Sequence, residues 1–377
     1  MSVWGEKFLI TCDPIDFVTN DFLGFARSST LCYEVSRRYH VYCQEFPNEK
    51  LGMCGSRLMV GTSQILEDLE HKIAEFHGAA SAFFAGSGYI ANLGLCYHLS
   101  LSSDILLWDE EIHMSVQKSL CVISGQHESF RHNDLNHLEQ LLQTYRASSS
   151  GRIFIFICSV YSFTGSLAPL SEIMGLASKY NAHLVVDEAH AIGIFGNQGR
   201  GLCHQWGYEH FYAVLVTYGK AMGAMGAALM TSPEVKKDLM HNSPPLRYST
   251  LVSPHTLITV GVAYDFLESE GKKARQQVFN LQKYFAAHYP AQALGCVQPI
   301  FIGTHLNNAI ATLEAANLNV GVVAFFTPPF LRVNLHAYNT IDEVNCLIQI
   351  LNRYLEKGCD RVYVDHEFHF WRKLCKK

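Results

Sequence analysis

The chain has 377 residues, enough for two or three domains or for one large α/β protein. Hydrophobic residues make up 49% of it and charged residues only 17%, a balance that predicts a folded chain rather than a disordered one. The formal net charge of −5 excludes the basic surface on which a general DNA- or RNA-binding protein depends.

The sequence shows no sign of a membrane segment, a disulfide framework or a metal site. No apolar run reaches the roughly 20 residues that a membrane span needs, and the first residues lack the basic-then-apolar order of a signal peptide. We therefore expect a cytoplasmic protein. The 12 cysteines include no CxxC pair, which predicts reduced, mostly buried thiols. The 19 histidines form no HExxH or HxxxH cluster, so no metal site is expected.

The first strongly periodic segment covers residues 64–77. Its apolar side chains recur at helical spacing, and Gly78 supplies the expected C-cap. A second helix is expected to begin near Gly88. The glycine-rich turn before it is a weak signal, because such a turn can also do no more than cap a helix.

The middle of the chain predicts an open, mostly parallel sheet. Short apolar runs bounded by turn residues predict buried strands at 152–158, 183–187, 212–217 and 227–231. A helical pattern over 170–180 lies between the first two and has the length of a crossover, which makes the second strand parallel to the first. Ligands bind such sheets outside the carboxyl ends of their strands, so polar residues directly after the apolar runs are the candidates for chemistry.

Beyond about residue 265 the pattern predicts a second, smaller α+β domain. Long helices are expected at 272–288 and 340–357, and short strands near 297–302, 320–326 and 330–336. The predicted fold class is thus α/β: a mostly parallel central sheet with helices on both faces and a smaller C-terminal α+β domain. We divide the chain into an N-terminal segment packing with the small domain (1–45), a large domain (46–265) and the small domain (266–377).

Two predicted strands run directly into titratable groups. The first is followed by Asp187-Glu188-Ala189-His190 and the second by Thr217-Tyr218-Gly219-Lys220. Taken singly, a structural carboxylate or a solvated lysine accounts for each motif about equally well. Together they are more specific, because a desolvated lysine amine can form a Schiff base with an aldehyde.

Pyridoxal phosphate chemistry needs such a lysine and a carboxylate against the pyridine nitrogen, since the protonated ring acts as an electron sink. Asp187 is the candidate for this partner. His190 can reach the phenolic oxygen of the ring, with a satisfied core histidine as the alternative. The turn at Gly88-Tyr89 offers backbone N–H groups to a phosphate, and His113 can stack on the ring, although alone it is an ordinary half-buried histidine.

The ordered motifs of the chain resemble the α-oxoamine synthases, a family of fold-type I pyridoxal phosphate enzymes. The resemblance runs from about Asp16 to Ile350 and rests on seven segments: Asn20–Gly24, Cys54–Leu58, Ser87–Asn92, Val186–His190, Gly196–Gly201, Thr217–Lys220 and Tyr248–Thr250.

The resemblance implies a role for each matching residue. Lys220 binds pyridoxal 5'-phosphate through its amine and later acts as general base, Asp187 pairs with the pyridine nitrogen, His190 bonds the phenolic oxygen and His113 stacks on the ring. Further implied cofactor contacts are Gly88, Tyr89, Ser162 and Thr217, together with Ser249 and Thr250 from the neighbouring subunit of a homodimer whose active site lies at the subunit interface. Implied substrate contacts are Asn20 and Arg332, which address the amino-acid carboxylate, and Thr327.

The implied reaction is a decarboxylating condensation of an amino acid with an acyl thioester. The stretches GKAMGAMGAAL and YSTLVSP are most similar to the branch that makes 8-amino-7-oxononanoate for biotin biosynthesis from L-alanine and a pimeloyl thioester, carried on coenzyme A or on a carrier protein. The alternatives are a synthase that uses glycine or serine, and a catalytically silent homologue that only binds the cofactor.

Several positions depart from the family pattern. The N-terminal arm is short, Leu66 replaces a histidine, and Cys158 replaces an acidic residue. Thr164 and Ser166 replace two aspartates, and Phe325–Pro329 form a shortened loop before Arg332. Neutral groups in place of carboxylates change the local electrostatics, so acyl or amino-acid specificity is where divergence is expected.

Overall fold

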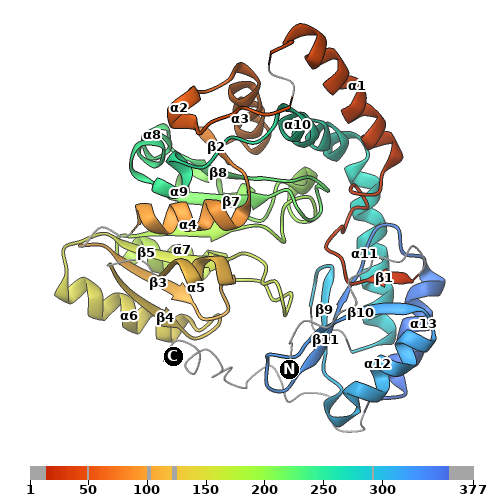
Figure 1. Ribbon diagram of the computed structural model, residues 1–377. Helices are drawn as coiled ribbons and strands as arrows, with labels where there is room; N and C mark the ends of the chain where they lie inside the picture. The colour runs from red at the N-terminus through yellow and green to blue at the C-terminus, as the bar shows by residue number, and fades with distance from the viewer. Residues whose placement is uncertain (1–13, 49–50, 100–102, 121–124, 291–292, 356–377) are drawn as a thin grey trace.

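The computed structural model describes residues 14–48, 51–99, 103–120, 125–290 and 293–355, which form two separate β-sheets (Figure 1). The sequence predicts a short N-terminal arm, and residues 1–13, where it would lie, are outside the described residues.

The larger sheet has seven strands in the order β2-β8-β7-β6-β5-β3-β4. Their bounds are β2 (Ser81–Ala85), β3 (Ile105–Asp109), β4 (Gln126–Phe130), β5 (Ile153–Cys158), β6 (Ala182–Asp187), β7 (Ala213–Thr217) and β8 (Ala227–Thr231). The pairs β4–β3, β3–β5, β5–β6 and β6–β7 are parallel, and only β8 runs antiparallel to its neighbours β7 and β2. The predicted strands and the predicted mostly parallel sheet are confirmed.

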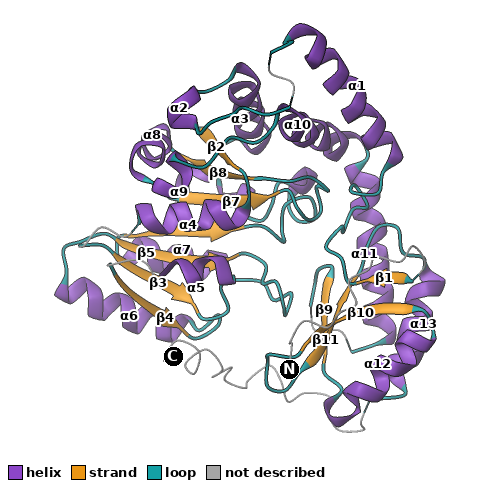
Figure 2. Ribbon diagram, in the orientation of Figure 1, coloured by secondary structure: helices purple, strands orange, loops and turns teal. Residues whose placement is uncertain are grey.

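The inner strands of this sheet are apolar runs, as expected where helices cover a sheet (Figure 2), whereas the edge strand β4 is polar and exposed over its first three residues. Every residue of β5, β7 and β8 is buried. The helices of this part of the chain are α2 (Arg57–Val60), α3 (Gln64–His77), α4 (Gly88–His98), α5 (Met114–Leu120), α6 (Leu135–Ser148), α7 (Leu170–Lys179), α8 (Pro233–Asn242), α9 (Pro244–Arg247) and α10 (Pro254–Ser269), with short 3₁₀ turns at Asn197–Gly199, Cys203–Trp206 and Tyr208–His210. The predicted crossover helix is α7.

The smaller sheet has four strands in the order β1-β10-β11-β9. They are β1 (Ile15–Phe17), β9 (Val297–Ile300), β10 (Leu318–Val323) and β11 (Phe330–Asn334), and they carry the helices α11 (Gly271–His288), α12 (Leu306–Ala315) and α13 (Ile341–Asn352) after a 3₁₀ turn at Gly303–His305. A second buried cluster, separate from that of the large sheet, forms its core.

One helix is shorter than its sequence predicts. The pattern predicts a helix over 340–357, whereas α13 ends at Asn352. The Tyr354 hydroxyl bonds Thr312 and the Asn308 carbonyl on α12, so the chain turns toward α12 there. Residues 356 and 357 lie outside the described residues.

The N-terminal segment contacts both parts of the molecule. Strand β1 pairs in parallel with β10 of the small sheet. Helix α1 (Ser29–Glu45) packs instead on α10, where Arg38 forms an ion pair with Asp265 at 2.7 Å. The division at residues 45 and 265 stays a prediction, and this segment bridges the two sheets.

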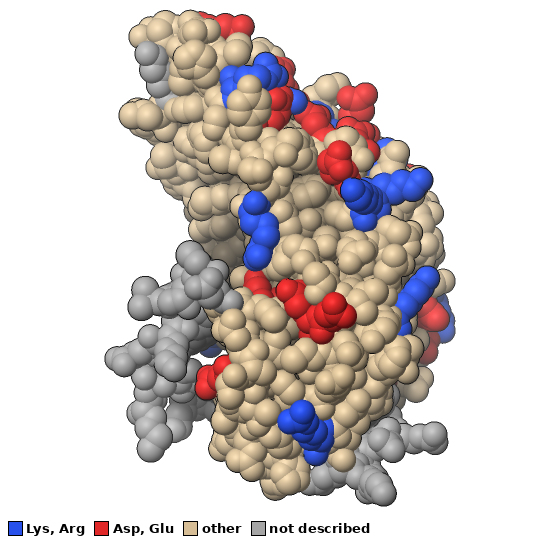
Figure 3. All heavy atoms as spheres, turned by 90° about the vertical axis from the view of Figure 1, so that its right-hand side faces the viewer, with Lys and Arg blue, Asp and Glu red and all other residues tan. Residues whose placement is uncertain are grey.

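The surface of the described chain carries few charges. On the face in Figure 3, Lys and Arg side chains alternate with Asp and Glu among a larger uncharged area. No helix in the described ranges combines the length and hydropathy of a membrane span. The eight cysteines in these ranges are free thiols, of which Cys96, Cys158, Cys203 and Cys296 are buried, so the expectation of mostly buried thiols holds for half of them.

Candidate active site

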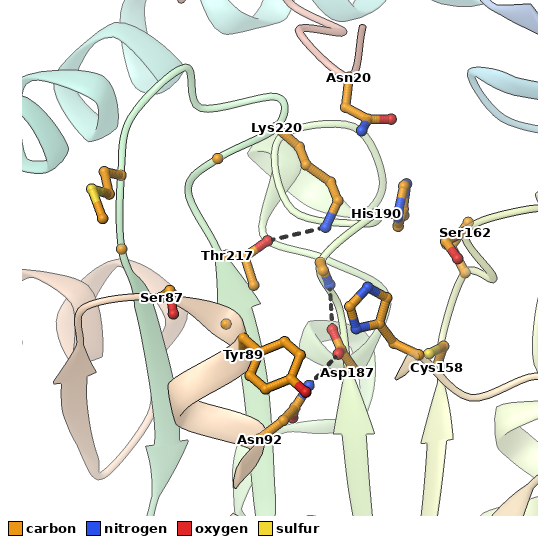
Figure 4. Close-up of a pocket in the computed structure, with 17 residues that line it drawn as sticks. Asn20, Ser87, Tyr89, Asn92, Cys158, Ser162, Asp187, His190, Thr217 and Lys220 are labelled. Atoms are coloured by element: carbon orange, nitrogen blue, oxygen red, sulfur yellow. Dashed lines mark hydrogen bonds between the residues drawn. The ribbon is translucent and has the colours of Figure 1, made fainter. Parts of the chain in front are cut away.

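A cavity of about 280 Å³ lies at the carboxyl ends of β5, β6 and β7, beside the start of α4 (Figure 4). This is the edge of the sheet where a ligand site is expected. The cavity brings together most of the predicted site residues: Asn20, Gly88, Tyr89, His113, Ser162, Asp187, His190, Thr217 and Lys220.

Asp187 is the last residue of β6 and is only 3% exposed. Its Oδ1 accepts a hydrogen bond from the backbone N–H of Ala189 at 2.9 Å, and its Oδ2 accepts one from Asn92 Nδ2 at 3.0 Å. Two donors thus fix the direction in which the carboxylate faces the cavity (Figure 4).

Lys220 follows β7 in a tight loop. Its Nζ donates a hydrogen bond to Thr217 Oγ1 at 3.4 Å, the contact drawn in Figure 4. Burial lowers the pKa of this amine, although the nearby Asp187 carboxylate acts in the opposite direction. The loop closes on Gly223, where φ is +61° and an added Cβ would lie 2.3 Å from the backbone nitrogen of Ala26.

Two histidines face the cavity from different loops. His190 is buried, and its Nδ1 has no hydrogen-bond partner among the described residues. Burial, and then the charge of Lys220, hold the pKa of His190 well below its usual value. His113 is open to the cavity, and its Nδ1 lies 2.8 Å from Ser115 Oγ.

The start of α4 forms one wall of the cavity. Ser87 caps this helix, because its Oγ accepts a hydrogen bond from Ile90 N and its carbonyl accepts one from Ala91 N. The first N–H groups of a helix lack partners within the helix and attract anions, and Gly88 and Tyr89 are the first two residues of α4. A Cβ at Gly88 would lie 2.5 Å from Thr217 Cγ2, so only glycine fits there without a shift.

Asn20 and Arg332 join the small sheet to the cavity. Arg332 lies on β11, donates from Nη2 to Asn20 Oδ1 at 3.0 Å, and donates from Nε to the Ser162 carbonyl at 2.7 Å. Among the described residues no carboxylate pairs with this guanidinium, and burial lowers its pKa to about 10. The group is suited to bind a carboxylate from outside.

Three predicted residues lie away from the cavity of this chain. The Ser249 hydroxyl donates to the Pro245 carbonyl, and Thr250 forms an isolated bridge with Ser56. Their predicted role in a neighbouring subunit stays a prediction. Thr327 is exposed in the loop between β10 and β11 and is not among the residues that line the cavity.

Sequence reasoning missed residues that complete the cavity wall. Asn92 bonds Asp187 directly, and Met225 lines the cavity although it is 65% exposed. Asn92 stands four residues after Gly88, one helical turn further along the same face of α4, and this spacing was the available signal.

The substituted positions have different surroundings. Leu66 is buried in the large core, whereas Cys158 lines the cavity. Thr164 and Ser166 bond each other at 2.8 Å, and Ser166 also contacts His132 at 2.9 Å. Of these four positions only Cys158 lines the cavity that contains Lys220.

The residues present fit pyridoxal phosphate by their own chemistry. A half-buried amine and a fixed carboxylate face one cavity, together with an imidazole nitrogen that has no partner among the described residues. A helix start without room for a Cβ is suited to a phosphate. Lys220 and Thr217, Asp187, His190, His113 and the first turn of α4 would hold the cofactor.

The fold and the site define a fold-type I transferase. The model of the family "Aminotransferase class I and II" matches residues 13–351, and the chain belongs to this family. It is similar to 8-amino-7-oxononanoate synthase from Emericella nidulans, with 28% identity over 93% of this chain and 91% of that protein. A Bacillus cereus protein given the same name provisionally is 30% identical over 85% of this chain and 80% of its own length.

Solved structures agree with the fold. A serine palmitoyltransferase from Sphingomonas wittichii superposes with a TM-score of 0.79 at 24% identity, covering 90% of this chain and 87% of that one. An 8-amino-7-oxononanoate synthase from Francisella tularensis gives 0.75 at 23% identity, covering 90% and 97%. Another neighbour, described as SPT with PLP internal aldimine, gives 0.79 at 22% identity, covering 90% and 87%. The resemblance to the α-oxoamine synthases is confirmed, and the roles of single site residues stay predictions.

Proposed function

We propose that this chain is a pyridoxal phosphate-dependent acyltransferase that joins an amino acid to an acyl thioester with loss of carbon dioxide. The observation that carries the proposal is the meeting of Lys220 and Asp187 in one cavity at the ends of adjacent strands. The family, and neighbours described with PLP, support the cofactor. The names of the curated relatives support the reaction class.

The bound cofactor supplies an electron sink that stabilises negative charge at the α-carbon of the amino acid. Asp187 would accept a hydrogen bond from the pyridine nitrogen, and His190 would donate one to the phenolic oxygen. The first turn of α4 would bind the phosphate. These groups come from three elements that the buried sheet holds in register, so the cavity is organised before the cofactor binds.

Arg332 and Asn20 bind the carboxylate of the amino acid. Lys220 Nζ, whose lowered pKa enlarges the neutral fraction, takes the α-proton and returns a proton to the product. In the overall reaction a bond forms between the α-carbon and the acyl carbon, the thiol leaves, and the carboxyl group leaves as carbon dioxide. The amino acid and the thioester thus give an α-amino ketone, a free thiol and carbon dioxide.

The substrates best supported are L-alanine and a pimeloyl thioester, carried by coenzyme A or by a carrier protein, with 8-amino-7-oxononanoate as product for biotin biosynthesis. The motif resemblance and the named relatives both favour them. We further propose a cytoplasmic homodimer whose active site includes Ser249 and Thr250 of the adjacent subunit.

The test uses purified full-length chain loaded with pyridoxal phosphate. With L-alanine and pimeloyl-CoA we expect thiol release together with a product of the mass of 8-amino-7-oxononanoate, and Arg332→Lys should raise KM for the amino acid more than it lowers kcat. The same assay with glycine and serine compares the amino acids. Rescue of a strain without the biotin-pathway synthase tests both substrates together. Cofactor binding without thiol release from any acyl thioester would favour the silent homologue.

One observation favours a different acyl group as a second candidate. Phe163, which follows the cavity residue Ser162, packs against Phe325 and Phe326 with ring centroids 5.1 and 5.4 Å apart. Aromatic rings beside the site suit an apolar chain better than the terminal carboxylate of a pimeloyl group. Faster thiol release from a long-chain acyl-CoA than from pimeloyl-CoA would support this candidate.

A further inference from the structure

A relay of two hydrogen-bonded side chains, Ser115 and Asn92, connects His113 to Asp187. His113 and Asp187 are the two residues expected to contact the cofactor ring. His113 Nδ1 lies 2.8 Å from Ser115 Oγ, and Asn92 Nδ2 lies 2.9 Å from the same oxygen. Asn92 Nδ2 also donates to Asp187 Oδ2 at 3.0 Å. Ser115 and Asn92 are 0% and 1% exposed, so water does not compete for these bonds.

The donors around His113 Nδ1 favour one direction of hydrogen bonding. The backbone N–H of Ser115 donates to this nitrogen over a long 3.2 Å contact, which favours an Nδ1 that accepts and carries no proton. The Ser115 hydroxyl then also donates to Nδ1, while its oxygen accepts from Asn92. A flipped Asn92 amide would place its oxygen against the Asp187 carboxylate, so its NH₂ group must face both acceptors.

We propose that Ser115 and Asn92 are positioning residues, which hold His113 neutral with its proton on Nε2 and tie its orientation to that of the Asp187 carboxylate. The proposal rests on the proposed function, because His113 and Asp187 are the groups expected to contact the ring of the cofactor. Neither Ser115 nor Asn92 was predicted from the sequence as a site residue.

The surroundings of His113 favour the neutral form. Burial is the main cause that lowers its pKa, and the charge of Lys220 adds to it. The Asp187 carboxylate acts in the opposite direction. Two other titratable groups face His113, namely His190 and the Cys158 thiol. The backbone N–H of His113 donates a hydrogen bond to this thiol. A neutral imidazole avoids placing a second cation against a protonated pyridine ring.

The experiment compares Ser115→Ala with Ser119→Ala in full-length chain. Ser119 lies one turn further along α5, is 1% exposed, and donates its hydroxyl to the Ser115 carbonyl, so its loss removes a buried hydroxyl outside the relay. Chains labelled with ¹⁵N at histidine are measured by NMR without added cofactor, and His113 is assigned by its absence from His113→Gln. Wild type and Ser119→Ala should show the proton on Nε2. Ser115→Ala loses the 2.8 Å contact of the hydroxyl and keeps only the longer backbone contact, so it should show a share of the Nδ1 tautomer and a higher His113 pKa.

Cofactor binding gives a second readout. With pyridoxal phosphate as the probe, Ser115→Ala should bind roughly threefold to tenfold more weakly, the equivalent of one lost hydrogen bond, and Ser119→Ala should match wild type. If Ser115→Ala does not fold, Asn92→Ala replaces it. Without its donor Asn92, the Ser115 oxygen is free to accept a proton from His113 Nδ1, so this variant should also mix the tautomers.

Three results would overturn the proposal: a proton on Nδ1 in wild type, unchanged tautomers in both relay variants, or equal changes in Ser119→Ala. Failure of the proposed function is a separate result. In that case wild-type chain would bind no pyridoxal phosphate, while the tautomer of His113 could still be read.

Discussion

Lys220 is the residue on which the proposed chemistry depends most. Replacing it with alanine removes the amine that would hold the cofactor covalently and move the α-proton. We expect the visible absorption band of the bound cofactor to shift or vanish in Lys220→Ala. Thiol release should fall by about 10²- to 10⁴-fold, the usual contribution of a positioned acid or base. Lys272→Ala, on the exposed start of α11, is the control and should keep both the band and the rate. An unchanged band in Lys220→Ala would refute the assignment.

His132 is a half-buried imidazole that lies between the carboxylates of Asp109 and Glu111. Burial alone would lower its pKa, but Asp109, whose Oδ1 lies 3.0 Å from His132 Nδ1, and Glu111 outweigh it and raise the pKa to about 9. Because the folded pKa exceeds the usual 6.5, the stabilisation is complete below pH 6.5 and is lost as the pH rises through 9. Burial raises the pKa of Glu111 to about 7. The change in unfolding free energy that comes from Glu111 itself therefore falls mainly below pH 7.

The prediction for His132→Gln concerns the window between pH 7 and 9. Wild type should lose roughly 2 kcal/mol more of its unfolding free energy across this window than the variant does. The variant should also be less stable at pH 7, because it leaves two carboxylates without their cation. Urea unfolding at each pH measures the difference, with His71→Gln on the exposed part of α3 as control. Parallel stability curves for wild type and His132→Gln would contradict the prediction.

At the scale of single elements, the start of α4 decides whether a phosphate can approach. A Cβ at Gly88 would press on Thr217, the residue that also accepts the hydrogen bond from Lys220. Gly88→Ala should therefore weaken pyridoxal phosphate binding about tenfold or more, roughly 1.4 kcal/mol, and lower the melting temperature. A fluorescence titration and a thermal melt measure both effects.

A matched glycine exists in α7. A Cβ at Gly175 would meet no atom within 4 Å, so Gly175→Ala should leave cofactor binding unchanged and stabilise the chain by up to about 1 kcal/mol through helix propensity. Equal cofactor affinities in the two alanine variants would show that the first turn of α4 does not bind the phosphate.

At the scale of the whole molecule, apolar side chains near the cavity and near the bridge between Ser56 and Thr250 are exposed. Met59, Tyr89, Met225 and Tyr248 are 78%, 49%, 65% and 59% exposed. Such exposure is typical of a surface that a second protein covers. It supports the proposed homodimer, in which the segment of Ser249 and Thr250 reaches the site of the other subunit.

Hybrid dimers test this arrangement. Lys220→Ala and Thr250→Glu should each be inactive alone, but random pairing of the two should restore about a quarter of the wild-type activity, because half of the dimers regain one intact site. Lys220→Ala paired with Asp187→Ala should restore none, since both residues belong to the same chain's cavity. A monomer in sedimentation, or no recovery in the first pair, would contradict a shared site.

Much of this fold could be predicted because its signals are local. The strands ending at Cys158, Asp187 and Thr217 are apolar runs followed at once by polar groups, and the α7 pattern between the first two fixes their parallel pairing. Helix ends were less predictable. The early end of α13 depends on a contact between Tyr354 and α12, which lies about 40 residues earlier in the chain.

The sequence by itself determined the class of sheet and the identities of Lys220, Asp187 and His190, because each follows directly from residue type at a strand end or in the loop after it. Only the tertiary structure decided that Asn92 and Ser115 connect His113 to Asp187, and that Arg332 of the small sheet bonds Asn20 and the Ser162 carbonyl beside the large sheet. These contacts join residues far apart in the chain. Their geometry depends on how the two sheets and the buried helices pack, and a local sequence pattern does not encode that packing.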